Sequence, residues 1–218
     1  MIKMIIFDLD GTLLNTLEDL ADAGNYALAE SGFPVYETEK YKYFIGNGIP
    51  KLIERITPET ADAELYSTMM NKFCLYYKEH MNNKTKPYDG ALKLLESLKE
   101  KGILSIVVTN KSHEFAEVIV KKYFGNLINR TFGSVEGYPK KPDPYWAKKA
   151  LSEFNIKENE ALYVGDSGVD MQTANKAGLI SIGVTWGFRT EDELINNGAV
   201  HICNSFNEIY KIISDNIY

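Results

Sequence analysis

Cysteine and histidine are scarce in this sequence. The two cysteines, Cys74 and Cys203, lie far apart and match no metal-binding spacing, so we expect reduced thiols without a disulfide. The three histidines, His80, His113 and His201, form no ligand cluster along the chain, and we assign them no chemical role. Reduced, unpaired thiols are typical of a cytoplasmic protein.

Long apolar runs and an excess of positive charge are also missing. No apolar run approaches the ~20 residues of a membrane span, and the first one is interrupted by Asp8 and Asp10, unlike a signal peptide. The formal net charge of −6 disfavours non-specific binding to nucleic acid or to an anionic membrane. We therefore expect a cytoplasmic protein without nucleic-acid or membrane partners, in which any anionic ligand needs a local positive site.

What the sequence does contain is the composition of an ordinary globular protein. Its 44% hydrophobic and 25% charged residues predict a packed core, far from disordered or collagen-like compositions. A length of 218 residues suits one domain carrying an insertion or two small domains. The choice between these, and the boundary, must come from the motifs, and the oligomeric state is not encoded in any pattern that we recognise.

Short apolar runs alternate with segments of helical spacing over much of the chain. The predicted strands are residues 4–7, 104–108, 161–164 and 180–184. The predicted helices are residues 91–101, 114–123, 145–154 and 170–177. This alternation predicts an α/β fold in which helices cover both faces of a parallel sheet.

The stretch from residue 16 to residue 85 breaks this alternation, because it shows helical spacing and few strand-like runs. Its first helix is predicted to begin with a capping box formed by Thr16 and Asp19. Gly32 and Pro34 are predicted to stop that helix.

Two further helices are predicted in the same stretch, over residues 50–56 and 60–79. Pro87 then marks the return to strand and helix alternation. We therefore predict an all-helical insertion, residues 16–85, within a parallel-sheet core made of residues 1–15 and 86–218.

Polar residues follow each predicted strand. In open parallel sheets, ligands bind beyond the carboxyl ends of the strands, so these residues should converge on one crevice. They are Asp8, Asp10, Thr109, Asn110, Asp166 and Asp170. Several carboxylates gathered without an equal number of cations repel one another, and a hard divalent cation bound through oxygen relieves that repulsion. The sequence therefore predicts a Mg²⁺ site that also binds a phosphate ester.

The same residues suggest a phosphoryl-transfer chemistry. An ionised Asp8 can attack phosphorus if the phosphate charge is masked, and Thr109, Asn110 and Lys141 offer the donors and the positive charge to mask it. Asp10, two residues further along an extended segment, lies on the same side and can protonate the leaving oxygen and then activate water.

Structural interpretations compete with these chemical ones. Asp8 and Asp10 could cap a turn or a helix, as could Thr109 and Asp170. Lys141 could be a solvated surface charge. The order of the motifs along the chain favours the chemical interpretation for the two aspartates.

Four motifs in order resemble those of the haloacid dehalogenase superfamily. They are Asp8-Leu9-Asp10-Gly11-Thr12, Val107-Val108-Thr109-Asn110, Lys141-Pro142-Asp143-Pro144 and Gly165-Asp166-Ser167-Gly168-Val169-Asp170. The resemblance spans the whole chain and implies a Rossmann-like core. It also implies that the helical insertion is a C1-type cap domain, which closes over small substrates, excludes water and selects the leaving group.

The resemblance also implies a role for each matching residue. Asp8 would be the nucleophile and Asp10 the acid/base partner, while Thr109 and Lys141 would bind the phosphoryl group. The implied Mg²⁺ ligands are Asp8, the main-chain carbonyl of Asp10 and Asp166, with Asp170 in support. Dehalogenases and phosphonatases of this superfamily lack an aspartate at the position of Asp10, and ion pumps have threonine there, so Asp10 favours a phosphatase or phosphomutase.

Two further stretches resemble the phosphoglycolate phosphatase branch of the superfamily. They are Phe44-Ile45-Gly46-Asn47-Gly48 and Trp186-Gly187-Phe188-Arg189. We include Gly46, Asn47 and Gly48 among the candidates for substrate contact, although a flexible turn is an equal alternative. Gly11, which permits a tight turn after Asp10, joins Asn110 among the phosphate-binding candidates.

The sequence thus predicts a Mg²⁺-dependent phosphatase that hydrolyses a small phosphomonoester, such as phosphoglycolate, through an aspartyl-phosphate. A sugar phosphomutase and an inorganic pyrophosphatase are alternatives within the superfamily, although no counterpart of the substrate-binding cap motif of β-phosphoglucomutases is evident. A regulator that binds a phosphorylated metabolite without turnover is the alternative of another class. Asp10 argues against it, because simple binding needs no proton shuttle.

Overall fold

A six-stranded parallel sheet forms the centre of the protein in a computed structural model that describes residues 1–58 and 61–215. Its strand order is β5-β4-β1-β6-β7-β8, and a separate antiparallel pair joins β2 to β3. The strands are β1 (Met4–Phe7), β2 (Leu14–Asn15), β3 (Lys86–Pro87), β4 (Leu104–Ser112), β5 (Arg130–Ser134), β6 (Ala161–Gly165), β7 (Ile180–Val184) and β8 (His201–Cys203). The predicted α/β architecture is confirmed.

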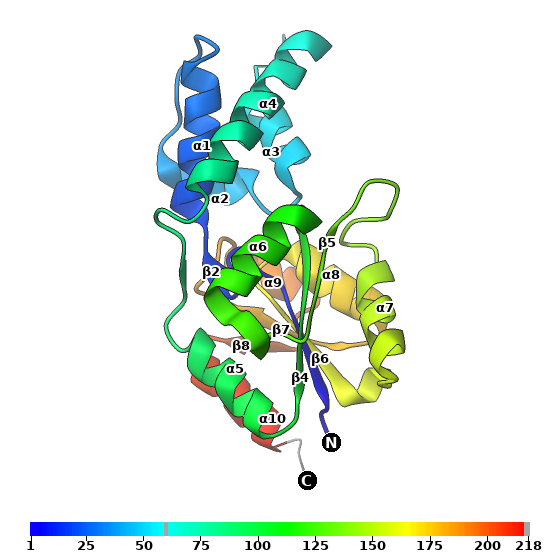
Figure 1. Cartoon of the computed structure of the whole chain (residues 1–218). Coiled ribbons are helices and arrows are strands. Elements are labelled where there is room, and N and C mark those ends of the chain that lie inside the picture. Colours follow the sequence, from blue (N-terminus) through cyan, green and yellow to red (C-terminus); the bar gives the residue numbers. More distant parts are fainter. Residues whose placement is uncertain (59–60, 216–218) are drawn as a thin grey trace.

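Helices cover both faces of the sheet and form a separate group above its carboxyl edge (Figure 1). The group above the sheet comprises α1 (Leu17–Ala29), α2 (Tyr41–Phe44), α3 (Ile49–Ile56) and α4 (Ala63–His80). The helices that flank the sheet or follow its last strands are α5 (Ala91–Glu100), α6 (His113–Phe124), α7 (Tyr145–Phe154), α8 (Gly168–Ala177), α9 (Glu191–Asn196) and α10 (Phe206–Asp215). Short 3₁₀ turns occur at Thr38–Lys40, Gly125–Leu127 and Glu158–Glu160.

The alternation of side chains along β1 explains why the sheet is covered on both faces. Ile5 and Phe7 pack on one side with α5, α6 and α10, while Met4 and Ile6 pack on the other with α7 and α8. All four side chains are fully buried. A strand that is apolar on both faces belongs in the middle of a sheet, and β1 indeed pairs with β4 and β6.

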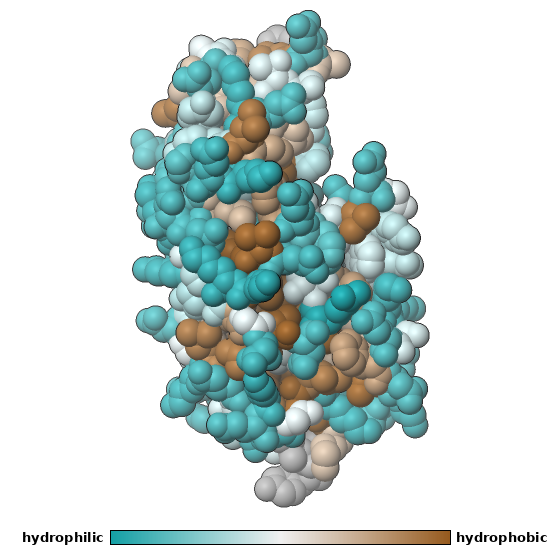
Figure 2. Space-filling model, in the orientation of Figure 1, coloured by the Kyte–Doolittle hydropathy of each residue, from teal (hydrophilic) through white to brown (hydrophobic). Residues whose placement is uncertain are grey.

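The helices α1 to α4 have a hydrophobic cluster of their own. It includes Leu20, Ile53, Phe73 and Tyr77 and also receives Phe115 and Phe188 from outside the group. The face of the molecule in Figure 2 is mostly hydrophilic, with hydrophobic residues in scattered patches. None of the helices within the described ranges has the length and apolar character needed to cross a membrane.

The predicted capping box at the start of α1 is wrong. Thr16 is the N-cap residue, but its side chain makes no capping hydrogen bond. Asp19 instead accepts hydrogen bonds from the main-chain N–H groups of Lys84 and Thr85, at 2.8 to 3.1 Å. A partner 65 residues away outcompetes the local one, and it joins the first turn of α1 to the segment that leads into β3.

Other predicted boundaries differ by a few residues. Strand β4 continues past Val108 to Ser112, with an irregularity in its pairing to β5 over that stretch. The helix predicted over residues 60–79 is observed as α4, and its predicted start at residue 60 lies outside the described residues. The strands β5 and β8 were not predicted, because each is short and mixes polar with apolar residues.

Candidate active site

The first loop after β1 carries two aspartates and a glycine. Asp8 is held by its main-chain N–H, which donates to the carbonyl of Val164 on the neighbouring β6 at 2.9 Å. Gly11 has a φ of +92°, and a Cβ atom there would lie 2.3 Å from Asp166 Oδ2. Only glycine fits this turn, because both the backbone conformation and the close carboxylate exclude a side chain.

Three carboxylates form a buried cluster at the carboxyl edge of the sheet. Asp8, Asp166 and Asp170 each bring an oxygen to within 4.8 Å of the others. Asp166 accepts hydrogen bonds from the Thr12 hydroxyl, at 2.9 Å, and from the Phe188 N–H, at 2.8 Å. The Asp10 side chain is not part of the cluster, so the predicted contribution of Asp10 to a metal rests on its main-chain carbonyl alone.

The Lys141 ammonium is the cation of this cluster. It lies 2.7 Å from Asp8 Oδ1 and 2.7 Å from Asp170 Oδ1, and its side chain is 3% exposed. Burial lowers the pKa of Lys141, but the carboxylates of Asp170 and Asp8 outweigh that effect and raise it well above its ordinary value. Lys141 therefore stays charged, and the structural interpretation of a solvated surface lysine is wrong.

Asp170 accepts hydrogen bonds from two residues, Ser167 and Lys141. Its second oxygen accepts from the N–H and the hydroxyl of Ser167, at 3.1 and 2.6 Å, in a capping box at the start of α8. Its first oxygen binds Lys141. Since both oxygens already accept hydrogen bonds, Asp170 suits a supporting position beside a metal better than a direct ligand position.

The residues around Asp8 fit a divalent cation. Burial raises the pKa of Asp8 to about 7, although Lys141 opposes this, and burial together with Asp170 and Asp8 raises the pKa of Asp166 to about 8. Despite the nearby ammonium, the buried oxygen Asp8 Oδ1 accepts no hydrogen bond of ordinary alignment. An oxygen without a hydrogen bond, within a cluster of oxygen donors that resists ionisation, is what a hard cation stabilises.

Lys111 was not predicted, yet it is the second cation of the site. It follows Thr109 and Asn110 on β4, is 4% exposed, and donates to both carboxylate oxygens of Asp10, at 3.1 and 3.2 Å, and to the Tyr77 hydroxyl, at 2.7 Å. Burial lowers the pKa of Lys111, but Asp10 and Tyr77 outweigh it and raise the pKa. A lysine at the end of a buried strand, next to two predicted site residues, was the signal available in the sequence.

The balance of charges in the site also favours a bound divalent cation. Four carboxylates, those of Asp8, Asp10, Asp166 and Asp170, face two ammonium groups, those of Lys111 and Lys141. With every group ionised, four negative charges minus two positive ones leave two negative charges uncompensated. A divalent cation would neutralise this remainder.

Thr109 and Asn110 line the same pocket as Asp8, but their side chains make different contacts. The Thr109 hydroxyl accepts from the Lys111 N–H at 3.2 Å and lines the pocket. The Asn110 amide accepts from the Lys141 N–H at 2.9 Å and donates to the Gly46 carbonyl at 3.2 Å. The side chain of Asn110 therefore positions neighbouring backbone, and only its main-chain N–H remains for the predicted phosphate contact.

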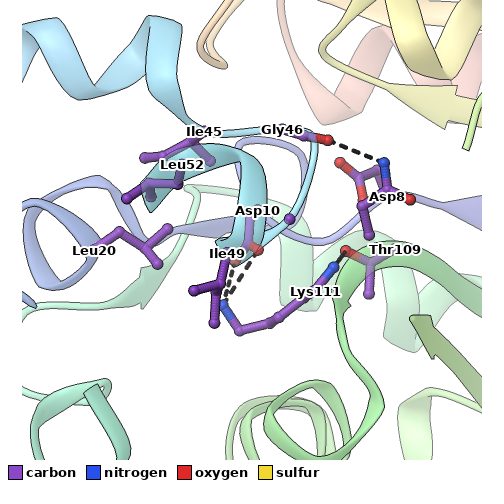
Figure 3. A pocket seen from close by; sticks show the side chains of 11 residues that line it. Asp8, Asp10, Leu20, Ile45, Gly46, Ile49, Leu52, Thr109 and Lys111 are labelled. Carbon is purple, nitrogen blue, oxygen red and sulfur yellow. Dashed lines mark hydrogen bonds and ion pairs between the residues drawn. The ribbon is translucent and has the colours of Figure 1, made fainter. Parts of the chain in front are cut away.

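A narrow pocket opens between the acidic loop and the helices above it (Figure 3). Its volume is about 30 Å³, which is room for about two water molecules. The lining residues are Asp8, Asp10, Leu20, Ile45, Gly46, Gly48, Ile49, Leu52, Thr109, Asn110 and Lys111. One wall is thus polar and the facing wall aliphatic, with Lys111 as the lining cation.

The predicted contact residues of the helical insertion divide into two groups. Gly46 and Gly48 line the pocket, whereas Asn47 does not. The side-chain oxygen of Asn47 instead accepts from Arg55 at 2.7 Å. Asn47 thus stabilises the conformation of its own loop.

The chain belongs to the haloacid dehalogenase-like hydrolases, because the model of that family matches residues 5–184. The predicted membership of this superfamily is thereby confirmed.

Proteins named phosphoglycolate phosphatase are among the similar sequences. The chain is 32% identical to one from Mannheimia succiniciproducens, over 97% of this chain and 98% of that protein. It is 34% identical to one from Thiobacillus denitrificans, over 86% of this chain and 85% of that protein. Among solved structures, a predicted phosphoglycolate phosphatase from Haemophilus somnus superposes with a TM-score of 0.92 at 29% identity, covering 97% of this chain and 98% of that one.

Proposed function

We propose that this protein is a Mg²⁺-dependent phosphatase that hydrolyses a small phosphomonoester through an aspartyl-phosphate on Asp8. The observation that carries the proposal is the position of Asp8, whose buried Oδ1 lies 2.7 Å from the Lys141 ammonium and inside a carboxylate cluster. The names of the similar proteins support phosphoglycolate as the first substrate to test.

The first half-reaction follows from the position of each side chain. A carboxylate oxygen of Asp8 attacks phosphorus, and the bond from phosphorus to the ester oxygen breaks. Asp10 gives a proton to the leaving oxygen. Lys141 and the Thr109 hydroxyl bind the phosphoryl oxygens, whose charge would otherwise repel Asp8.

The second half-reaction reverses the role of Asp10. Its carboxylate takes a proton from water, the water oxygen attacks phosphorus, and Asp8 leaves as the free carboxylate together with inorganic phosphate. Lys111 orients Asp10 through the contacts at 3.1 and 3.2 Å. A Mg²⁺ ion, held by Asp8, Asp166 and the Asp10 carbonyl, would supply charge neutralisation of the phosphate when bound.

We also propose that residues 16–85 act as the cap over this site, with the remainder as the catalytic core. The aliphatic wall of the pocket supports this assignment, because Leu20, Ile45, Ile49 and Leu52 all come from that stretch. The aliphatic side chains of this wall offer no hydrogen-bond partners to the many hydroxyl groups of a sugar.

A phosphate-release assay tests the proposed function. Purified protein is offered phosphoglycolate, other phosphomonoesters, a sugar phosphate and pyrophosphate, each with Mg²⁺ and with EDTA. We expect Mg²⁺-dependent phosphate release from a small monoester. Isomerised sugar phosphate would indicate a mutase, cleavage of pyrophosphate alone would indicate a pyrophosphatase, and binding of a phosphorylated compound without turnover would indicate a regulator.

Removal of the metal should make the stability of the protein depend on pH. The pKa values of Asp8 and Asp166 are raised in the folded protein from 3.8 to about 7 and about 8. Their protonated forms favour folding at low pH, and this contribution is lost as the pH rises through 7 to 8. In EDTA we expect the free energy of unfolding to fall by about 4 kcal/mol between pH 6 and pH 8.5, because both groups release their protons in that range.

Urea denaturation at the two pH values measures this change. Saturating Mg²⁺ should stabilise the protein more at pH 8.5 than at pH 6, because the ion binds the deprotonated carboxylates. A stabilisation by Mg²⁺ that is equal at both pH values would contradict the proposed metal site.

Loss of the Lys111 charge should destabilise the protein. In Lys111→Met the Asp10 carboxylate loses its cation while its side chain stays only 12% exposed, so we expect a loss of about 3 kcal/mol in the free energy of unfolding. Tyr77→Phe, which removes only a hydroxyl partner of Lys111, should cost about 1 kcal/mol. Urea denaturation compares both with Lys140→Met, a change at an exposed lysine. Equal midpoints for Lys111→Met and Lys140→Met would contradict the assigned role of the ion pair.

A further inference from the structure

The segment Trp186 to Arg189, after β7, lies directly against the carboxylate cluster. The Phe188 N–H donates to Asp166 Oδ2 at 2.8 Å, and the Trp186 indole N–H donates to the Thr12 carbonyl at 3.0 Å. A Cβ atom on Gly187 would lie 2.2 Å from the Cβ of Asp166. The backbone of the segment therefore packs directly against Asp166, and position 187 has no room for a side chain.

The same segment reaches in the other direction into the helical insertion. The Phe188 side chain is buried within the hydrophobic cluster of α1 to α4. The Arg189 guanidinium donates to the Ile45 carbonyl at 2.7 Å and to the Lys42 carbonyl. Neighbouring residues thus bind a proposed metal ligand on one side and the backbone of the insertion on the other.

A second arginine binds the same loop from within the insertion. Arg55, on α3, donates to the carbonyls of Tyr43 and Phe44, at 3.2 and 2.9 Å, and to the Asn47 side chain, at 2.7 Å. The whole chain contains only three arginines. Two of them therefore bind one segment, residues 42–48, which comprises the end of α2 and the turn into α3 and which we name the pocket loop.

The pocket loop forms part of the wall that faces the leaving group. Ile45, Gly46 and Gly48 line the pocket, and the Gly46 carbonyl accepts from the Asn110 amide at 3.2 Å. A Cβ atom on Gly48 would lie 2.9 Å from the Asn110 carbonyl oxygen. A small displacement of the pocket loop would therefore change the space available beside Asp8.

Glu193 holds the Arg189 side chain in place. Its Nε lies 3.5 Å from Glu193 Oε1, and the same oxygen accepts from the Gly168 N–H at 3.1 Å. The Arg189 side chain is only 10% exposed. A planar guanidinium held in this way can bridge two carbonyls, which a lysine ammonium cannot do in the same geometry.

We infer that Arg189 is a positioning residue for substrate selection: it holds the pocket loop against the core so that only a small leaving group fits beside Asp8. Arg189 acts through the loop and does not touch the reacting atoms. The inference deepens the proposed function and rests on it for its kinetic test, but the position of the loop can be measured without any turnover.

The kinetic test compares two monoesters with leaving groups of different size. For Arg189→Ala we expect kcat/KM for phosphoglycolate to fall about 10²-fold, as for other misplaced positioning groups. The value for p-nitrophenyl phosphate, which is bulky, should stay unchanged or rise. Arg189→Lys should behave like Arg189→Ala if the bridge matters, and like the wild type if only the charge attracts the substrate. Arg130→Ala, at an arginine outside the site, is the matched control.

Hydrogen exchange gives the independent measurement. The Ile45 N–H, bonded to the Tyr41 carbonyl at 3.0 Å, reports the order of the pocket loop. We expect faster exchange of residues 42–48 in Arg189→Ala and Arg189→Lys, with the sheet unaffected. Equal losses on both substrates, or unchanged exchange in the pocket loop, would overturn the inference. Absence of wild-type turnover on any monoester would refute the proposed function instead, and the exchange data would then decide the role of Arg189.

Discussion

Phosphate release should be abolished when Asp8 is replaced by asparagine. The substitution preserves the shape of the side chain but removes the nucleophile, and we expect a loss of at least about 10⁴-fold in kcat. The folded protein should not lose stability in EDTA, because Asp8 is one of three buried carboxylates that repel one another. Loss of activity without loss of stability separates a chemical role from a structural one.

The measurement is Mg²⁺-dependent phosphate release at saturating substrate, with urea denaturation on the same preparation. Asp215→Asn, at an exposed aspartate near the end of α10, is the matched control and should retain full activity. Near-wild-type turnover in Asp8→Asn would refute the covalent mechanism, whichever substrate is used.

Replacement of Asp10 by asparagine should slow both half-reactions. General acid and base catalysis contributes about 10² to 10⁴-fold, and an amide can perform neither step. Affinity for Mg²⁺ should change little, because the Asp10 side chain lies outside the carboxylate cluster. The neutral side chain can still accept a hydrogen bond from Lys111, so the local structure should persist.

Rapid-quench kinetics with a ³²P-labelled monoester can follow the two steps separately. In Asp10→Asn the labelled protein should form slowly and also decay slowly, while Mg²⁺ titration gives a wild-type affinity. A variant that forms the phosphoprotein at the normal rate would show that another group protonates the leaving oxygen.

The sequence could predict those parts of the molecule that depend on local patterns. The buried run at β1 and the acidic motif after it define a strand and a polar loop within ten residues, and the observed Asp8 environment agrees with that expectation. By contrast, β5 and β8 are strands mainly because they pair with β4 and β7 at the edges of the sheet. Their own residues carry too little periodicity to be recognised.

Long-range partners also explain what the sequence could not predict at the candidate site. Asp19 matches a capping pattern, yet it binds the backbone of Lys84 and Thr85. Lys111 resembles a charged residue at a strand end, and only the fold reveals that Asp10 and Tyr77 surround it. In both cases the deciding contact spans tens of residues, beyond the reach of any local pattern.

The antiparallel pairing of β2 with β3 brings the two ends of the stretch between them together. Leu14 and Asn15 pair with Pro87 and Lys86, so the stretch proposed as the cap begins and ends at one place. The entropy of closing a loop grows only slowly with its length. A change in the length of the proposed cap should therefore cost the proposed core little stability, because the two strands of this junction stay paired.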